Sequence, residues 1–421
     1  MLQQIQPGVN LHIIPTEKYK TIRLFVRFSN RHEKLAAAKR TLLTSLLETN
    51  SLNYPTQTAF SSHLAELYGA SFGVGVGKKG QFHQVNVGMS IVNGKYVNDP
   101  TLLQQAFAFL KEVLFYPNIK AEQFDLTTFN LEKENLLAYL ASTKEDKQYY
   151  ASLRLQEIYF GTDENQMTPS FGNPKDVATV TASELARTHQ QMITDDQVDI
   201  FVVGDVSEQQ VLAEVKQLPF APREILTSNF FYQQTSQPLK EVFEVEEVTQ
   251  AKLNLGFQTD IYYTDADRFA LMVFNGLFGG FPHSKLFTNV REKANLAYYA
   301  SSNYDSFRGF LNVQTGIDGQ NYQQALQLIK EQLVALQTEP IDDVALEQTK
   351  AMLINQFLLS QDNPQALIER QFLETCFPAT RLSEGQFIEA IQAVTSAEVK
   401  AVAQKIKLQA VFFLDGGNDN A

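Results

Sequence analysis

Cysteine and long apolar runs are almost absent from this chain of 421 residues. The single cysteine, Cys376, excludes an internal disulfide framework and is typical of a protein from a reducing compartment. We expect Cys376 to be a small buried apolar side chain, because no histidine adjoins it to activate the thiol. No apolar run reaches the length of a membrane span, and residues 1–8 lack the features of a signal peptide. A cytoplasmic protein without a membrane segment is therefore predicted.

Basic residues are fewer than acidic ones, 35 against 47, and the formal net charge is −12. This balance argues against a nucleic-acid partner, which requires a basic surface. It could favour basic peptides, but the general solubility of a cytoplasmic protein is the simpler explanation. The run Gly73–Lys79 lacks the spacing of a phosphate-binding loop, and its alternation with valine predicts a strand. No nucleophile elbow or cysteine–histidine pairing indicates nucleophilic catalysis.

Histidine is too sparse for a helical zinc site. Neighbouring histidines are at least 20 residues apart in the sequence. A zinc helix of the inverted His-x-x-Glu-His type needs two histidines four residues apart with a glutamate between them. His63 and Glu66 supply half of that pattern, but Leu67 stands where the second histidine belongs, so an ordinary amphipathic helix is predicted. A composite site from distant segments stays open.

The chain is long enough for two or three domains, and it has the pattern of a duplicated unit of about 215 residues. Residues 180–204 and 394–416 each begin with a helix-start signal and continue into an apolar strand that ends in glycine. Residues 218–240 are rich in Pro, Ser, Thr and Gln and predict a linker. We therefore expect domains at 1–217 and 241–421.

Each half begins with strand material and continues into long helical segments. Residues 21–28 and 251–257 alternate as half-buried antiparallel strands do, and residues 72–88 predict a hairpin. Residues 131–140 and 346–354 each open a helical segment. This mixture predicts an α+β fold of two tandem homologous domains, each a mainly antiparallel sheet covered by helices.

The most informative stretch is 284–299, which follows a Gly/Pro turn. Ser284 is expected to cap a helix whose apolar residues bury one face and leave Arg291 projecting near its end. Asn295 is expected to end the helix, and a strand carrying Tyr298 should follow. Arg291 and Tyr298 could serve as donors to a peptide substrate. The alternative is a salt-bridged arginine and a core tyrosine.

This stretch resembles the C-terminal-domain signature of the pitrilysin/insulinase (inverzincin) metallopeptidase family. The resemblance implies two similar domains that face each other like a clam shell. It also implies a zinc ion on an inverted His-x-x-Glu-His helix of the N-terminal domain. In the family, the residues that match Arg291 and Tyr298 reach across from the second domain, hydrogen-bond the substrate backbone and stabilise the oxyanion.

The zinc positions implied by the resemblance are not filled here. The family's zinc helix corresponds to residues 36–50, where the two histidine positions fall on Ser45 and Thr49 and only Glu48 keeps its identity. The third ligand position falls near Tyr139 to Ala141, which carry no carboxylate, while Glu134 matches a supporting acid. We therefore expect no metal site in this chain.

The pattern resembles the non-zinc, catalytically inactive subunit of bacterial two-subunit members of the family. That resemblance implies a heterodimer with a zinc-bearing homologous peptidase subunit and a peptide substrate. Arg291 and Tyr298 would then act on the substrate in trans, and the isolated chain would hydrolyse nothing. The alternatives are a purely structural or peptide-binding protein with no role in catalysis, and an autonomous zinc peptidase.

Overall fold

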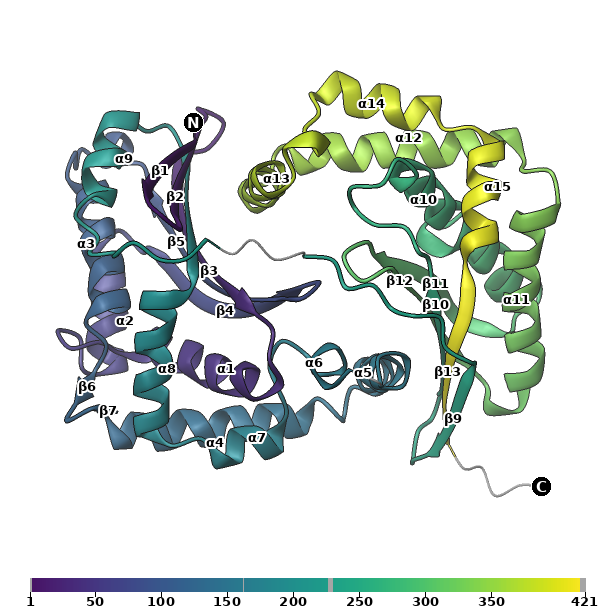
Figure 1. The fold of residues 1–421 in the computed structure, drawn as a ribbon, viewed down its shortest axis with the longest axis horizontal. Coiled ribbons are helices and arrows are strands. Elements are labelled where there is room, and N and C mark those ends of the chain that lie inside the picture. The colour runs from purple at the N-terminus through teal and green to yellow at the C-terminus, as the bar shows by residue number, and fades with distance from the viewer. Residues whose placement is uncertain (1, 162, 226–229, 417–421) are drawn as a thin grey trace. The chain divides into compact units, whose positions relative to one another are not determined.

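The computed structural model describes residues 2–161, 163–225 and 230–416. The chain forms two compact units, each with strands and helices (Figure 1). Unit 1 comprises Met1–Ala141, Thr168–Asn229 and Asp362–Leu373, and unit 2 comprises Ser142–Met167, Phe230–Gln361 and Glu374–Ala421. The predicted two-domain α+β class is confirmed. Each unit takes one segment from the other half of the sequence, which the contiguous ranges 1–217 and 241–421 did not anticipate.

Unit 1 contains a six-stranded sheet in the order β1-β2-β8-β3-β5-β4. Only β2 and β8 pair in parallel, and the other neighbours are antiparallel. The predicted opening strand is β3, and the predicted hairpin is β4 with β5. The bounds are β1 (Leu2–Gln6), β2 (Val9–Pro15), β3 (Thr21–Arg31), β4 (Ser71–Lys79), β5 (Phe82–Val92) and β8 (Gln197–Gly204).

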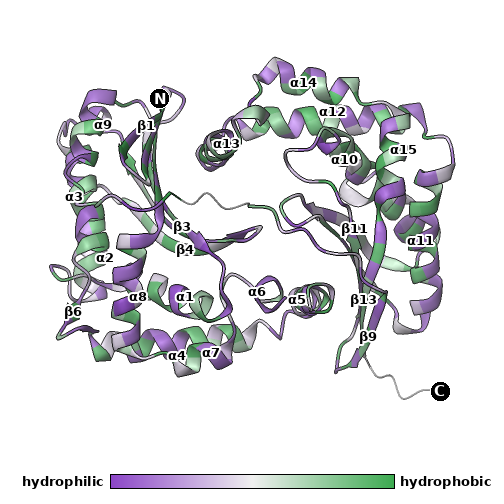
Figure 2. Cartoon of the chain, in the orientation of Figure 1, coloured by the Kyte–Doolittle hydropathy of each residue, from purple (hydrophilic) through white to green (hydrophobic). Residues whose placement is uncertain are grey.

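Helices of unit 1 pack on one face of this sheet around a single apolar core. They are green on one side and purple on the other in Figure 2, as amphipathic helices over a sheet should be. They are α1 (Lys34–Thr49), α2 (Gln57–Glu66), α3 (Leu102–Phe115), α4 (Leu126–Ser142), α7 (Pro174–Thr179), α8 (Ala182–Asp195) and α9 (Glu208–Val215), with a small ladder of β6 (Ile119–Lys120) and β7 (Gln123–Phe124).

Unit 2 repeats the topology with a five-stranded sheet in the order β11-β12-β10-β13-β9. Its only parallel pair is β13 with β9, which corresponds to β8 with β2 in unit 1. The duplication inferred from sequence is therefore visible in the strand order. The bounds are β9 (Lys240–Val245), β10 (Ala251–Gln258), β11 (Ala297–Asp305), β12 (Phe310–Ile317) and β13 (Lys407–Asp415).

The helices of unit 2 include two π-helical segments, η2 and η3. The two predicted helix starts, Thr181 in unit 1 and Thr395 in unit 2, are both complete capping boxes. In each, a glutamate lies three residues after the threonine. The helical elements of this unit are α5 (Lys147–Tyr159), α6 (Glu164–Met167), α10 (Arg268–Asn275), η2 (Gly276–Gly280), η3 (Leu286–Lys293), α11 (Tyr322–Thr338), α12 (Asp343–Ser360), α14 (Glu384–Ala393) and α15 (Ser396–Lys405).

One helix from each half of the sequence belongs to the other half's sheet. Helix α5 packs on β10 and β13 and buries Leu155 and Tyr159 with Phe310 and Phe412. Phe413, the next residue of β13, points into the other core, so α5 covers the face opposite the helical layer. Reciprocally, most of α13 (Pro364–Cys376) belongs to unit 1. Neither sheet is therefore completed by its own half of the sequence.

An ion-pair cluster attaches α13 to the sheet of unit 1. Glu369 Oε2 accepts from Arg27 Nη2 at 2.8 Å, and Glu369 Oε1 lies 2.5 Å from Lys79 Nζ. The Arg27 guanidinium also lies 4.4 Å from the ring centroid of Phe372, which is 1% exposed. Burial disfavours the charge on Glu369, but Arg27 and Lys79 outweigh it and lower its pKa.

The predicted linker, 218–240, is anchored on both sides of residues 226–229, which lie outside the described residues. Phe220 and Arg223 are buried, and Arg223 Nη1 donates to the carbonyl of Asp196 at 3.1 Å. Further on, Gln234 Nε2 donates to the carbonyl of Tyr159 at 2.7 Å.

Cys376, which was expected to be fully buried, is half-buried. No helix within the described ranges combines the length and apolar character needed to cross a membrane.

Replacing Glu369 by glutamine should destabilise unit 1 by about 1–3 kcal/mol at neutral pH, because it leaves the buried Arg27 without its anion. The folded pKa of Glu369 is lowered, so its contribution is complete above the unfolded pKa of about 4.3 and is lost as pH falls through the folded value. The denaturation midpoints of wild type and Glu369→Gln should therefore converge in acid. Glu33→Gln is an exposed control and should change the free energy of unfolding little. If Glu369→Gln lost as much stability below pH ~3 as at pH 7, the assignment would be contradicted.

Candidate functional site

The candidate site begins at the turn into η3. The Ser284 hydroxyl accepts from the backbone N–H of Phe287 at 3.4 Å, so it acts as the predicted cap although the helix begins at Leu286. At the other end, the N–H of Leu296 donates to the carbonyl of Val290 at 3.1 Å. Asn295 between them has a φ of +53°, a left-handed conformation that asparagine tolerates. This reversal sends the chain directly into β11.

A β-bulge at the start of β11 determines where Tyr298 points. Ala297 lies opposite Ile317 and Tyr299 lies opposite Gly316, so Tyr298 is the extra residue with no partner on β12. A bulge shifts the in-and-out alternation by one residue and often re-aims a side chain beside a functional site. Ala300 is buried, whereas Tyr298 is 67% exposed. The bulge therefore turns Tyr298 out of the core.

The neighbouring Tyr299 has a structural role. Its hydroxyl donates to Gln148 Oε1 on α5, and Lys252 Nζ lies 5.4 Å from its ring centroid. Burial raises the pKa of Tyr299 well above its usual range, with a smaller contribution from Asp146. Of the two adjacent tyrosines, Tyr299 anchors the strand and Tyr298 is left accessible.

Arg291 is exposed near the end of η3. Its guanidinium lies 4.4 Å from the ring centroid of Phe287, one turn earlier on the same helix. Within the part of the chain that the structure describes, no carboxylate forms an ion pair with Arg291. Together with the exposure of Tyr298, this differs from a salt-bridged arginine beside a core tyrosine.

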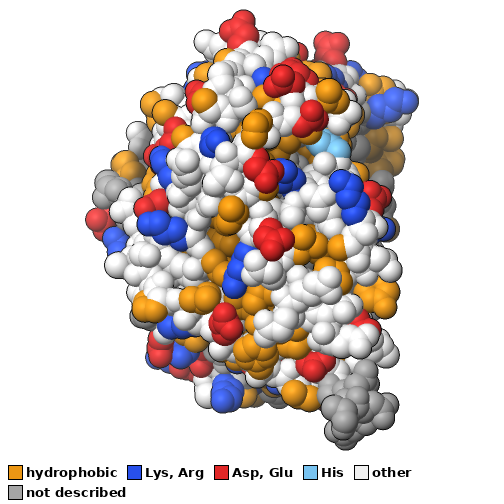
Figure 3. Space-filling view, turned by 90° about the vertical axis from the view of Figure 1, so that its right-hand side faces the viewer, with side chains coloured by type: hydrophobic (Ala, Val, Ile, Leu, Met, Phe, Trp, Pro, Cys, Tyr) orange, Lys and Arg blue, Asp and Glu red, His pale blue; other side chains and the backbone are white. Residues whose placement is uncertain are grey.

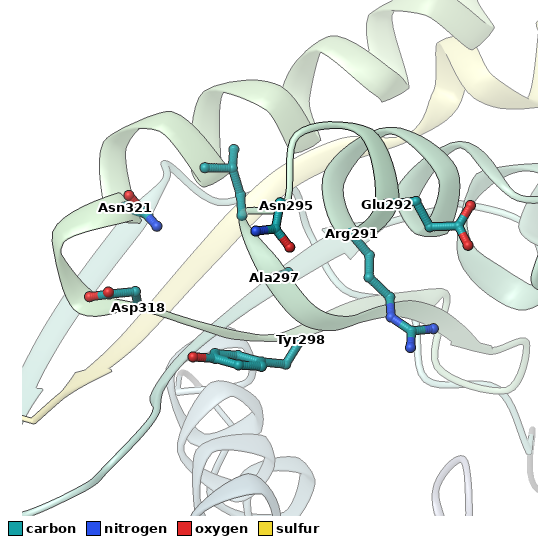
Figure 4. Close-up of a pocket in the computed structure, with 8 residues that line it drawn as sticks. Arg291, Glu292, Asn295, Ala297, Tyr298, Asp318 and Asn321 are labelled. Atoms are coloured by element: carbon teal, nitrogen blue, oxygen red, sulfur yellow. The ribbon is translucent and has the colours of Figure 1, made fainter.

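Arg291 and Tyr298 line one pocket of about 550 Å³, drawn in Figure 4. The Tyr298 ring extends toward the side where Asp318 and Asn321 lie, while the Arg291 side chain extends downward in this view, away from these two residues. The wall is mainly polar and combines a cation, a phenol, two amides and two carboxylates. Its lining residues are Arg291, Glu292, Asn295, Leu296, Ala297, Tyr298, Asp318 and Asn321.

The positions implied for zinc ligands lie near the C-terminal end of α1 in unit 1. Thr49 Oγ1 donates to the carbonyl of Ser45 at 2.8 Å and lies 3.2 Å from Glu132 Oε1. The carboxylate that approaches this end of α1 therefore comes from Glu132. The expected position near Tyr139 to Ala141 lies about two turns too late on α4, where Tyr139 is 63% exposed. Glu134 is also exposed.

The buried face of α4, which follows from the spacing of its apolar residues, identifies Glu132. The buried residues of this helix are Phe129, Leu136 and Leu140. Glu132 is three residues after Phe129 and four before Leu136, so it shares their face. Choosing the carboxylate by helical phase, instead of by spacing along the sequence, would have placed Glu132 beside α1.

Glu48, the one residue of the zinc motif that keeps its identity, makes a different contact. Its carboxylate accepts the backbone N–H of Val74 on β4. Desolvation against β4 raises the pKa of Glu48; the bond from Val74 opposes this, and the nearby Glu132 adds to it. A glutamate engaged with a backbone donor does not have the free carboxylate of a general base.

These side chains do not fit a zinc ion. The hydroxyls of Ser45 and Thr49 stand at the positions of the imidazoles that zinc prefers, and the Thr49 hydroxyl already bonds to the Ser45 carbonyl and lies beside Glu132. Across the described ranges, no three His, Cys, Asp or Glu side chains gather as a metal-holding group.

Each histidine is engaged elsewhere in its own unit. Burial lowers the pKa of His189 to about 4, and burial with Arg40 nearby lowers that of His83, so both are neutral under ordinary conditions. The side-chain partners are Asp199 for His12, the Thr168 carbonyl for His32, Glu66 for His63, Arg40 and the Ser170 carbonyl for His83, the Leu114 carbonyl for His189, and Thr349 for His283.

Comparisons with known proteins identify relatives of this chain. Residues 179–353 match the family model described as the peptidase M16 inactive domain. The probable inactive metalloprotease YmfF of Bacillus subtilis is 37% identical over 412 residues, which cover 97% of this chain and 96% of that protein. The uncharacterized zinc protease YmxG of the same organism is 24% identical over 240 residues, 56% of this chain and 58% of that one.

A solved structure extends the likeness to three dimensions. The crystal structure of a conserved protein from Enterococcus faecalis V583 has a TM-score of 0.96 and 54% identity, and it covers 100% of this chain and 99% of that chain. The match to YmfF spans nearly the whole length of both proteins. This chain therefore belongs to the peptidase M16 family of pitrilysin/insulinase metallopeptidases, as a homologue of its inactive members.

Proposed function

We propose that this chain is the non-zinc subunit of a two-chain peptidase. It forms a heterodimer with a zinc-bearing homologue, binds a peptide substrate, and supplies Arg291 and Tyr298 in trans. The partner contributes the metal, which activates water and polarises the scissile carbonyl. The isolated chain has no hydrolytic activity of its own.

The observation that carries this proposal is the accessible pairing of Arg291 and Tyr298 around one pocket. A guanidinium without an ion-pair partner keeps its donors available to a ligand. A phenol turned outward by a bulge exposes both its hydroxyl and its ring, at the cost of one unpaired residue in the strand. Both side chains are thus placed to contact a ligand, and neither is needed to hold the sheet together.

The chemistry expected of the two residues is hydrogen-bond donation to a peptide. Arg291 can hold backbone carbonyl oxygens through its planar set of N–H groups, and Tyr298 can donate one O–H to an oxygen that gains negative charge. Donors of this kind, placed before the reaction begins, lower a barrier by about 3–4 kcal/mol each where water is excluded. These residues alone cannot generate a nucleophile, which explains why the chain needs a catalytic partner.

A second candidate is a purely structural or peptide-binding protein with no role in catalysis. The pocket supports it to the extent that Asp318, Asn295 and Asn321 offer peptide-binding groups without any nucleophile or metal. Acidic and basic side chains are interspersed with apolar ones on the face drawn in Figure 3, which is the surface of an ordinary globular protein. The two candidates differ in whether the chain changes the rate of a partner.

The deciding experiment mixes the chain with a zinc-bearing homologue, such as one encoded beside it, and measures cleavage of an unstructured peptide. We expect activity in the mixture only. Arg291→Ala should lower kcat/KM about 10²–10³-fold through loss of transition-state donors. Tyr298→Phe should lower it by a similar factor, because it removes the O–H donor.

Lys293→Ala is the matched control, because Lys293 is an exposed cation on the same helix and does not line the pocket. It should leave the rate of the mixture within about twofold of wild type. Unchanged rates for both Arg291→Ala and Tyr298→Phe, with a heterodimer still formed on gel filtration, would refute catalysis in trans and favour the purely structural protein.

A separate prediction concerns the lost metal. The double variant Ser45→His/Thr49→His, with Glu132 already beside residue 49, should bind about one equivalent of zinc, because it restores two imidazoles four residues apart and a nearby carboxylate. Metal analysis and a rise in thermal midpoint with zinc measure this. Adding Glu132→Gln should weaken the gain about 10–100-fold. Equal zinc content in wild type would revive the autonomous peptidase.

A further inference from the structure

Strand β4 is an edge strand of the sheet in unit 1. Within the described residues it lies at the end of the strand order, and its ladder partner is β5. Backbone N–H groups in an antiparallel pair alternate between the partner strand and the opposite side. The N–H of Val74 points to the free side, because it donates to Glu48 on α1 and not to β5. An edge of this kind is a template on which another strand can pair.

Val74 is flanked by two glycines, and Glu48 lies against the first of them. A Cβ added to Gly73 would meet only Glu48 Oε1 at 3.3 Å, and one added to Gly75 would meet nothing within 4 Å. Glycines in a strand often mark a place where another backbone approaches closely. Glu48 is thus the side chain that occupies the outward hydrogen-bonding position of Val74.

We propose that Glu48 closes the edge of β4 at Val74 to an added peptide strand. Its carboxylate takes the N–H that the first carbonyl of such a strand would use, and it places a negative charge where a neutral backbone would have to lie. The residue that corresponds to the general base of the zinc motif therefore has a different role in this chain. The inference deepens the proposed function and rests on it only in taking an extended peptide as the ligand.

The neighbours of Glu48 hold it in this position. Helix α1 packs against β4, and Thr49, the next residue, is hydrogen-bonded to Ser45 and lies beside Glu132 on α4. Glu132 also lies near enough to raise the pKa of Glu48. The end of α1 is thus hydrogen-bonded, with one carboxylate on the edge of the sheet.

The test compares Glu48→Ala with Glu48→Gln in the isolated full-length chain. Glutamine keeps an oxygen that can accept the Val74 N–H, whereas alanine removes the acceptor. A fluorescein-labelled eight-residue peptide of alternating valine and threonine serves as the probe. We expect Glu48→Ala to bind it at least about tenfold more tightly than wild type, and Glu48→Gln and the control Glu33→Ala to bind as wild type does.

Backbone hydrogen exchange provides an independent measurement. Without peptide, exchange of the Val74 amide should be at least about tenfold faster in Glu48→Ala than in wild type, while the Val85 amide on β5 stays protected and reports an intact fold. Addition of the probe should restore protection at Val74 in Glu48→Ala.

The inference would be overturned if Glu48→Ala bound the probe no more tightly than wild type, or if Glu48→Gln bound it as tightly as Glu48→Ala. Self-association of Glu48→Ala that the probe does not reverse would also overturn it. Arg291→Ala in the Glu48→Ala background separates this inference from the proposed function. The gain in affinity should persist there, because the edge and Arg291 belong to different units. If the gain in probe affinity persists but Arg291→Ala leaves the cleavage rate of the mixture unchanged, the inference about β4 is supported and the proposed function is not.

Discussion

Each sheet of this protein depends on a helix supplied by the other half of the sequence. Strand alternation gives both sheets two faces to cover, and the helices of one half cover only one of them. Helix α5 covers the second face in unit 2, and α13 contributes Ile368 and Phe372 to unit 1. The duplicated halves are therefore similar in topology but not independent in packing, and the compact units cut across the repeat.

The exchanged helix α5 also supports the candidate site. The Tyr299 hydroxyl donates to its Gln148, and Gln314 of the neighbouring strand β12 donates to its Ser152 at 2.8 Å. These bonds anchor the end of the sheet at which the bulge occurs, and the bulge turns Tyr298 outward. Arg291 lies near the end of η3, and the left-handed Asn295 just after that helix reverses the chain into β11. The pocket thus results from two local backbone features beside a strand anchored by α5.

The end of α1 in unit 1 is held by hydrogen bonds between side chains and to the backbone. Thr49 is hydrogen-bonded to Ser45 and lies beside Glu132, and Glu48 is bonded to β4, so the end of α1 is satisfied without a metal. Unit 2 contrasts with this, since Arg291 keeps its donors available.

Local sequence patterns were sufficient to identify several elements and the lack of a helical His-x-x-Glu-His motif. Alternation of apolar residues identified β3, β4 and β10, capping residues identified the starts of α8 and α15, and histidine spacing excluded a zinc helix, because these signals are local. Three other features required the tertiary structure. The exchange of α5 and α13, the approach of Glu132 to Thr49 and the outward turn of Tyr298 depend on packing between distant segments and on strand register, which no local pattern encodes.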